Sequence, residues 1–205
     1  MIVDEKRRLA LKGMGALWAM STLGVSLNAN EIKNNAGKEK LLVLVSREKE
    51  SFLDGLNETK VYDKVVREVD FAGNFSDSRK ILENEFVKGD AKKVVGILDN
   101  ANFVILSELL KRHNSTFEMQ IFHNSAGEKL THLANANGLS KSFFNTTTSL
   151  LKDENWSYMI GYALGSGDFS QSFFRNSNSQ KVESFTQKDV KLVSFIIQKK
   201  EVTNV

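Results

Sequence analysis

Runs of apolar residues mark the positions of strands in this chain. Leu41–Val45 is an uninterrupted apolar run, which is typical of a strand covered on both faces. Val94–Leu98 has the same character, and Phe117–Phe122 alternates as a half-buried strand does. The pattern predicts a strand at each of these positions and a closing strand at Val190–Gln198.

Apolar residues recur at helical spacing between these runs. Phe52, Leu53 and Leu56 predict a short helix. Tyr62–Val69 also has a helical pattern of apolar positions, but its β-branched residues favour a strand. Both interpretations stay open here, and a strand over Val65–Phe71 is preferred.

Capping residues predict two longer helices. Ser76 is a good N-cap for the first, and Gly89 is well placed to end it. Asp99 or Asn100 could cap the second, from Ala101 to about Arg112. The side chains expected to face inward are Ile81, Leu82 and Phe86 in the first helix, and Phe103, Val104, Leu106, Leu109 and Leu110 in the second.

The second half of the chain is less regular. Leu130–Phe144 suggests helical packing, and Thr146–Ser149 is either a loop or a helix start. Trp156–Leu164 fits a helix or a strand, and Ser170–Gln187 is rich in Ser, Asn and Gln. No internal repeat and no clear second domain are visible.

Alternating strands and helices in the first half predict an α/β fold. We expect a single domain over residues 41–205, with a central, mostly parallel sheet flanked by helices and a less regular C-terminal third. Residues 30–40 are polar and charged, and are predicted to be a linker.

The first 29 residues have the parts of an export signal. Lys6, Arg7 and Arg8 give a positive start, Gly13–Leu27 is uncharged, and the small Ala29 is the expected cleavage site. The uncharged run is shorter than the about 20 apolar residues of a membrane-spanning helix. A removable peptide is therefore predicted, with no stable membrane span after cleavage.

Residues 7–12 resemble the twin-arginine (Tat) signal motif. The residues that match it are Arg7, Arg8, Leu11 and Lys12. Lys6 stands where Ser or Thr is usual, and Ala10 replaces the common Phe. The resemblance implies that the Tat translocase exports the protein, already folded, to a bacterial periplasm. A general secretory signal or an ordinary amphipathic first helix is the alternative.

Charge argues against nucleic acid as a partner. The chain has 205 residues and a net charge of +3, but its first 29 residues carry four basic and two acidic side chains. The remaining residues are therefore nearly neutral, with charges that alternate in sign. A chain of this length can bury a core of one domain.

The chain contains no Cys and no Pro. The absence of Cys excludes disulfides, Cys-ligated iron–sulfur clusters and covalently attached haem c. Proteins that use the Tat route often carry redox cofactors, so any cofactor here must be held without thiolates. The sequence does not identify one.

Three histidines, His113, His123 and His132, lie within 20 residues. We expect His113 at a helix end, His123 at a strand end and His132 on the next element, an arrangement that allows convergence at one sheet edge. Neutral imidazoles there would bind zinc, copper or non-haem iron. The spacing fits no standard zinc pattern, so structural roles are favoured. His123 with His132 is the pair to test first.

Two further features have a structural and a functional interpretation. Asp99 follows a predicted strand, where α/β folds place functional acids, but capping the next helix is favoured. Gly161–Asp168 is glycine-rich but lacks the Lys and Ser/Thr of a phosphate-binding loop. A helix from about Asp153 that ends at these glycines explains the segment without a ligand.

Asp153–Ser157 matches the pattern Asp/Glu-x-Asn-x-Ser/Thr, which resembles acceptor sites of some bacterial N-glycosylation systems. Asn155 would be the acceptor. The chain has five plain Asn-x-Ser/Thr triplets, so an accidental match is the alternative. Trp156 beside it is expected to pack against the domain.

These observations leave two main function hypotheses. The preferred one is an exported accessory or binding protein associated with a redox system, with a periplasmic oxidoreductase as its partner. The alternative is a periplasmic enzyme or cofactor binder with a site built from His123, His132 and Asp99. A third possibility is that the protein uses this route only because it folds too fast for the other.

Overall fold

The computed structural model describes residues 40–46, 49–59, 61–113, 115–137, 141–166, 178–186 and 189–199. The predicted signal peptide, with its motif and Ala29, lies outside these residues, as does the predicted linker up to residue 39. Within the described part of the chain, no helix is long and apolar enough to cross a membrane.

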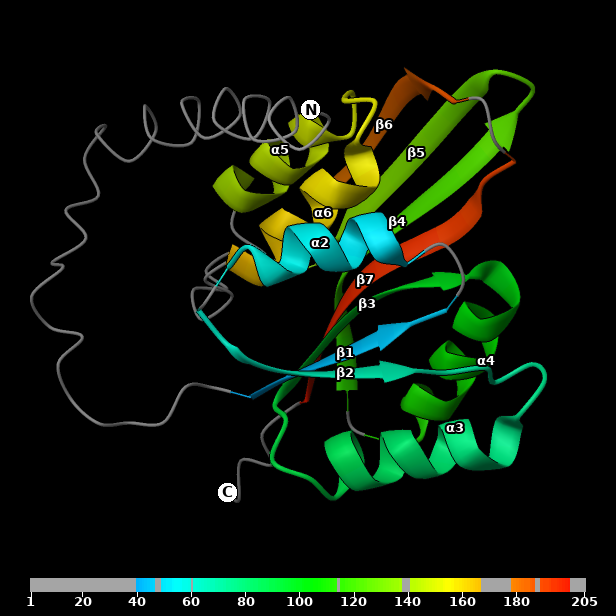
Figure 1. Ribbon diagram of the computed structural model, residues 1–205, viewed down its shortest axis with the longest axis vertical. Coiled ribbons are helices and arrows are strands. Elements are labelled where there is room, and N and C mark those ends of the chain that lie inside the picture. The colour runs from blue at the N-terminus through cyan, green and yellow to red at the C-terminus, as the bar shows by residue number, and fades with distance from the viewer. Residues whose placement is uncertain are drawn as a thin grey trace, which may run out of the picture. The chain divides into compact units, whose positions relative to one another are not determined.

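The described residues form one sheet of seven strands in the order β2-β1-β3-β7-β4-β5-β6 (Figure 1). The strands are β1 (Lys40–Val45), β2 (Asp63–Glu68), β3 (Lys93–Asp99), β4 (Ser115–Ala126), β5 (Lys129–Ala136), β6 (Asn178–Phe185) and β7 (Lys191–Lys199). Parallel pairing joins β1 to β2 and β3, whereas the other neighbours pair antiparallel. The fold is therefore α/β with a mixed sheet, and the expected parallel character is limited to the first three strands.

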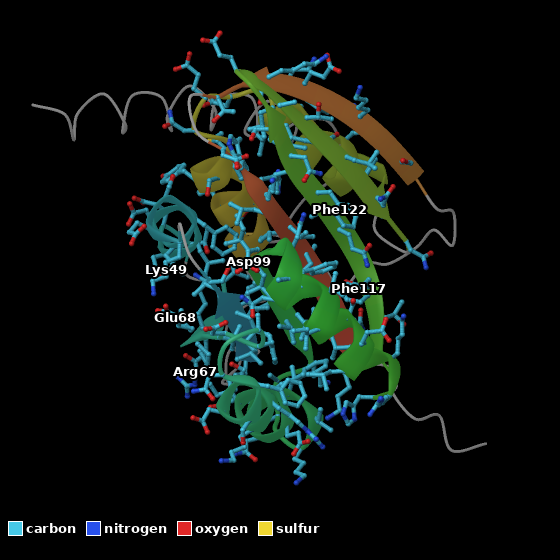
Figure 2. All side chains as sticks on the ribbon, turned by 90° about the vertical axis from the view of Figure 1, so that its right-hand side faces the viewer. Lys49, Arg67, Glu68, Asp99, Phe117 and Phe122 are labelled. Carbon is cyan, nitrogen blue, oxygen red and sulfur yellow. The ribbon has the colours of Figure 1, made fainter. Side chains whose placement is uncertain are left out.

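Helices lie on both sides of this sheet. They are α2 (Glu50–Asn57), α3 (Phe75–Leu82), the π-helical continuation η1 (Glu83–Val87), α4 (Asn100–Lys111), α5 (Lys141–Leu150) and α6 (Trp156–Ser166). Helices α2, α5 and α6 cover one side, and α3, η1 and α4 cover part of the other (Figure 1). Figure 2 shows this second side, where α4 lies beside β4 and its labelled Phe117 and Phe122.

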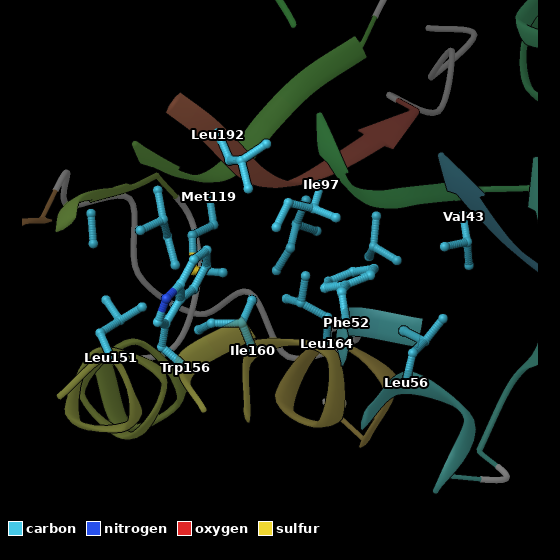
Figure 3. Close-up of a cluster of buried hydrophobic side chains, with 14 of the residues drawn as sticks. Val43, Phe52, Leu56, Ile97, Met119, Leu151, Trp156, Ile160, Leu164 and Leu192 are labelled. Carbon is cyan, nitrogen blue, oxygen red and sulfur yellow. The ribbon is translucent and has the colours of Figure 1, made fainter. Parts of the chain in front are cut away.

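The apolar run at β1 is explained by burial on both faces. Leu41, Val43 and Val45 belong to the core beneath α2, α5 and α6. Leu42 and Leu44 belong to the core beneath α3 and α4. Figure 3 shows the first of these cores, with side chains of α2 and α6 pointing toward those of the sheet.

Glycines allow α2 and α6 to pack at close range. A Cβ on Gly55 would lie 2.0 Å from the carbonyl oxygen of Tyr158, and a Cβ on Gly161 would lie 2.0 Å from that of Phe52. Gly165, one helical turn further along α6, meets the end of α2 in the same way. These two glycines of α6 therefore have a packing role inside the predicted helix.

Two details of the predicted helices are wrong. Asn74, not Ser76, caps α3, and its side-chain oxygen accepts a hydrogen bond from the Asp77 amide at 3.4 Å. Val104 is 58% exposed because it lies on the outer side of α4, whereas the neighbouring Phe103 is buried against the sheet.

The prediction of helical packing over Leu130–Phe144 is also wrong. β5 occupies residues 129–136 and pairs with β4 across a tight turn at Gly127 and Glu128. Gly127 has a φ of 62°, the left-handed conformation that two-residue hairpin turns require. The helix of this region, α5, begins only at Lys141.

The structure decides each segment for which the sequence left both a helical and a non-helical interpretation open. Residues 63–68 are strand β2, residues 146–149 lie inside α5, and residues 156–164 lie inside α6. Part of the polar segment 170–187 forms the edge strand β6. The strands predicted around residues 41–45, 94–98, 117–122 and 190–198 are all present.

Candidate functional site: a buried histidine pair

His123 and His132 face each other across the β4–β5 hairpin. They are directly opposite in the strand pairing, and their Nδ1 atoms lie 2.7 Å apart. Both side chains are completely buried. The expectation that His123 lies at a strand end is wrong, because both residues lie within their strands and point to the α5–α6 side.

Two serines extend this contact into a row of hydrogen bonds across four strands. His123 Nε2 lies 2.9 Å from Ser194 Oγ on β7, and His132 Nε2 lies 2.8 Å from Ser184 Oγ on β6. Ser194 is completely buried, whereas Ser184 is half-buried at the sheet edge. We call these four residues the histidine row. Every ring nitrogen in it has a partner.

Trp156 closes the row on the helix side. Its ring stacks on the His123 ring at a centroid distance of 4.2 Å and an interplanar angle of 28°. The His132 ring meets it edge-on at 5.3 Å. Trp156 is the first residue of α6, so this stacking contact lies at the start of that helix.

Burial keeps both imidazoles neutral. Desolvation lowers the pKa of His132 from 6.5 to about 4. Desolvation also holds the pKa of His123 well below its usual value, and the charge of a protonated His132 would lower it further. The pair is therefore uncharged at neutral pH.

Counting donors limits the proton positions in the row. One proton must lie between the two Nδ1 atoms, so one ring donates it and the other accepts. Either Ser194 donates to His123 Nε2 and His132 Nε2 donates to Ser184, or all three hydrogen bonds run the other way, from Ser184 to Ser194. In both arrangements each ring carries one proton, and one outer Nε2 accepts from a serine.

His113 does not join this site. It follows the end of α4, where its backbone amide donates to the Leu110 carbonyl at 3.0 Å. Helix α4 packs on the other side of the sheet, so the expected convergence of all three histidines is wrong. Among the residues that the structure describes, no group of three or more His, Asp or Glu side chains could hold a metal ion.

Asp99 caps α4. Its Oδ1 accepts a hydrogen bond from the Asn102 amide at 3.0 Å, and its Oδ2 accepts one from Asn102 Nδ2 at 2.7 Å. Its own amide donates to Ser46 Oγ at 2.9 Å, which ties the ends of β3 and β1 together. Burial raises the pKa of Asp99, but these hydrogen bonds outweigh it and hold the pKa below its usual value. Both carboxylate oxygens are thus engaged in the cap.

The structure contains a second buried pair of polar side chains, Lys93 and Glu118, which the sequence did not indicate. Lys93 Nζ and Glu118 Oε2 lie 4.0 Å apart, and both side chains are 6% exposed. Burial raises the pKa of Glu118, and the positive charge of Lys93 opposes this shift. Glu118 lies at an irregularity in β4 between Phe117 and Met119. A bulge of this kind turns a strand residue inward without any signal in the alternation.

The candidate acceptor Asn155 is exposed, just before α6. Its backbone N–H donates to Asp153 Oδ1 at 2.8 Å, while the next residue, Trp156, is buried. The hydroxyl oxygen of Ser157 is buried. Glycosylation at this position stays a prediction.

No protein-family model matches this chain, and no curated protein or solved structure matches it either. The function therefore has to be argued from the described residues. Sequence reasoning missed the partners of the histidines, namely Ser184, Ser194 and Trp156. The signal for Ser194 was present, because a lone Ser inside the apolar strand Leu192–Ile197 needs a buried hydrogen-bond partner.

Proposed function

We propose that this protein is an exported accessory protein of the periplasm, carried there folded by the Tat translocase, and that it binds a periplasmic oxidoreductase. The Arg7-Arg8 motif and the lack of thiolates support export in the company of a redox partner. One structural observation supports the binding role: half of one sheet face has no described helix over it.

This open face belongs to β4, β5 and β6, on the side opposite α5 and α6. Its residues are Gln120, Phe122, Asn124, Lys129, Thr131, Leu133, Asn135, Ser179, Lys181 and Glu183. Phe122 and Leu133 are directly opposite at its centre. Leu133 is 41% exposed, while Phe122 is partly covered by Phe103 of α4 at 5.9 Å between ring centroids. Figure 2 shows Phe122 on this side of β4.

The chemistry of the open face suits a folded protein. It combines an apolar centre with a polar rim, as protein interfaces do. It is built from neighbouring extended strands, whereas small molecules prefer concave sites. A second protein with an apolar surface patch could cover Phe122 and Leu133 together, because the two side chains are directly opposite.

Charge on the rim specifies the partner further. Lys129 and Lys181 both reach the same oxygen of Glu183, each at 2.9 Å. All three side chains are well exposed, so these ion pairs contribute little to stability. Two ammonium groups share one carboxylate, and the rim retains a positive charge. A partner with acidic residues around an apolar patch would complement it.

The experiment is recovery of the tagged full-length protein from the periplasm, with oxidoreductase activity and an absorbance spectrum measured on what co-purifies. We expect a protein with a redox chromophore at a fixed ratio. Leu133→Glu should lose it, because a carboxylate would stand at the centre of the contact. Leu133→Lys should lose less, because the partner is acidic. Glu at this position can pair with Lys181 directly opposite, so the fold is retained.

The matched control is Val61→Glu, which changes an exposed apolar residue beside β2, at the other edge of the sheet. Val61 is 51% exposed, and the variant should keep the partner. Recovery of the wild type alone contradicts the proposal. Retention of the partner by Leu133→Glu contradicts the assignment of the open face.

A further inference from the structure

The histidine row lies where the α5–α6 layer meets the sheet. Trp156 stacks on His123 at the start of α6, and no charged group is needed to hold this contact. The neutral row satisfies each of its ring nitrogens by hydrogen bonds alone. The contact that Trp156 makes with the sheet at the start of α6 is therefore a contact with an uncharged histidine pair.

Among the described residues, none that packs against the pair carries a counter-charge for an imidazolium. The side chains that share this core with the pair are apolar, among them Ile121, Leu130 and Leu192. Glu118, on the same strand as His123, pairs with Lys93, and Asp189 accepts a hydrogen bond from Ser125 Oγ. The charged residues of β5, β6 and β7 that pairing places on the opposite face are Lys129, Lys181, Glu183 and Lys191. Asp153 and Glu154 precede α6 and are not fully buried.

Adding one proton disrupts the row in two ways. The proton has to enter at the outer Nε2 that lacks one, because only one proton fits between the two Nδ1 atoms, which lie 2.7 Å apart. The serine at that end must then turn from donor to acceptor, which leaves its hydroxyl hydrogen without the acceptor it had. The new charge is also buried away from water, which disfavours the charged form.

We propose that the His123–His132 row is an acid-operated latch, and that its protonation releases Trp156 and the α5 end of the helical layer from the sheet. The device is independent of the proposed partner.

The release is local because the two ends of α6 are held differently. Gly161 and Gly165, toward its C-terminal end, pack against the backbone of α2, and Thr59 Oγ1 donates to the Gly165 carbonyl at 2.7 Å. The N-terminal end is held by Trp156 on the histidine row, and the adjoining α5 by a hydrogen bond from Thr148 Oγ1 to Gln180 Oε1 of β6 at 2.9 Å. Acid therefore loosens α5 and the first turn of α6, while β1 and β3 keep their pairing.

The test uses the full chain with Trp18→Phe, which makes Trp156 the only tryptophan. We expect its fluorescence to shift to that of a solvated indole in one step as the pH falls from about 7 toward about 4. Proton uptake between one and two per molecule should accompany the step. Amide exchange should rise in α5 and at the start of α6, and stay slow in β1 and β3.

In the same background, His123→Gln with His132→Gln should move the step by about one pH unit or more to lower pH, because two amides can bond to each other without titrating. His113→Gln should leave it unchanged. An identical midpoint in the double variant overturns the proposal.

Nitrogen NMR of labelled histidines in the chain with the native pair decides the matter even if the double variant fails to fold. The proposal requires protonation of the rings and release of Trp156 to occur together, with the same midpoint. Rings that become protonated while Trp156 stays buried overturn it.

Discussion

Phe122 and Leu133 are a cross-strand pair on the open face of the sheet, and the next pair toward the turn is His123 and His132 on the buried face. The hairpin thus carries the proposed binding centre and the histidine row on adjacent rungs. Because successive side chains point to opposite faces, the two do not touch. A change at Leu133 should therefore leave the histidine titration intact, which makes the two proposals separable.

Stability should rise with pH in the range where the histidines titrate. The pKa of His132 falls from 6.5 to about 4 on folding, and that of His123 is also lowered, so the unfolded chain binds more protons between these values. The free energy of unfolding should increase by up to about 1.4 kcal/mol per pH unit from pH ~4 to ~6.5 on account of His132, with a further contribution of the same sign from His123, and level off above.

Urea unfolding at several pH values measures this slope. Glu118 has a raised pKa, so it contributes with the opposite sign near and above its usual value. Replacing both histidines with Gln should flatten the curve. A curve that is the same in the wild type and in the variant with both Gln residues would contradict the burial of neutral imidazoles.

Gly161→Ala should destabilise the protein, although Ala is the better helix former. The new Cβ would stand 2.0 Å from the Phe52 carbonyl oxygen, so α2 and α6 must move apart. We expect a loss of about 1–3 kcal/mol in the free energy of unfolding, measured by urea denaturation. Gly127→Asn is the control, because nothing lies within 4 Å of its Cβ position and Asn tolerates its φ of 62°. Equal losses in both variants would refute close helix packing as the cause.

Asp99→Ala should lower stability by about 1 kcal/mol or somewhat more, because it removes the cap of α4 and the partner of the Asn102 amide. Asp99→Ser keeps an oxygen for the Asn102 backbone and should recover most of the loss. Thermal unfolding of the two variants makes the comparison. If both are as stable as the wild type, capping is not the main role of Asp99, and its interpretation as a functional acid is favoured instead.

Changing Arg7 and Arg8 together to Lys should block export by the Tat route and leave the protein in the cytoplasm. Fractionation of cells that express the tagged full chain measures this. A general secretory signal needs only positive charge, so normal periplasmic amounts would leave export itself standing and remove the Tat assignment. Changing Lys6 to Gln alone serves as the control and should have little effect.

The sequence was most informative where one residue pattern matched one structure. Leu41–Val45 and Val94–Leu98 predicted buried strands, and Asp99 predicted a cap, because these features are local. The mixed character of the sheet was not visible, since it depends on where β7 inserts. The residues of Val190–Gln198 predict a strand, but they do not indicate that this strand pairs with both β3 and β4.

The histidine pair was within reach of the sequence through the turn. Gly127-Glu128 closes a two-residue hairpin loop, and strand pairing outward from Ala126 and Lys129 leads to His123 opposite His132. The interpretation of Leu130–Phe144 as helical hid this register. Trp156 could not have been placed, because its contact with His123 depends on how α6 lies on the sheet.

The position of β7 has a consequence for synthesis. The strands β2, β1 and β3 on one side and β4, β5 and β6 on the other are joined in the sheet only through β7, which comes last among the described strands. A nascent chain whose β7 is still inside the ribosome holds two partial sheets with unpaired edges. Completion of the fold therefore follows translation of residues 191–199, and a chain truncated before them would present those edges to chaperones and proteases.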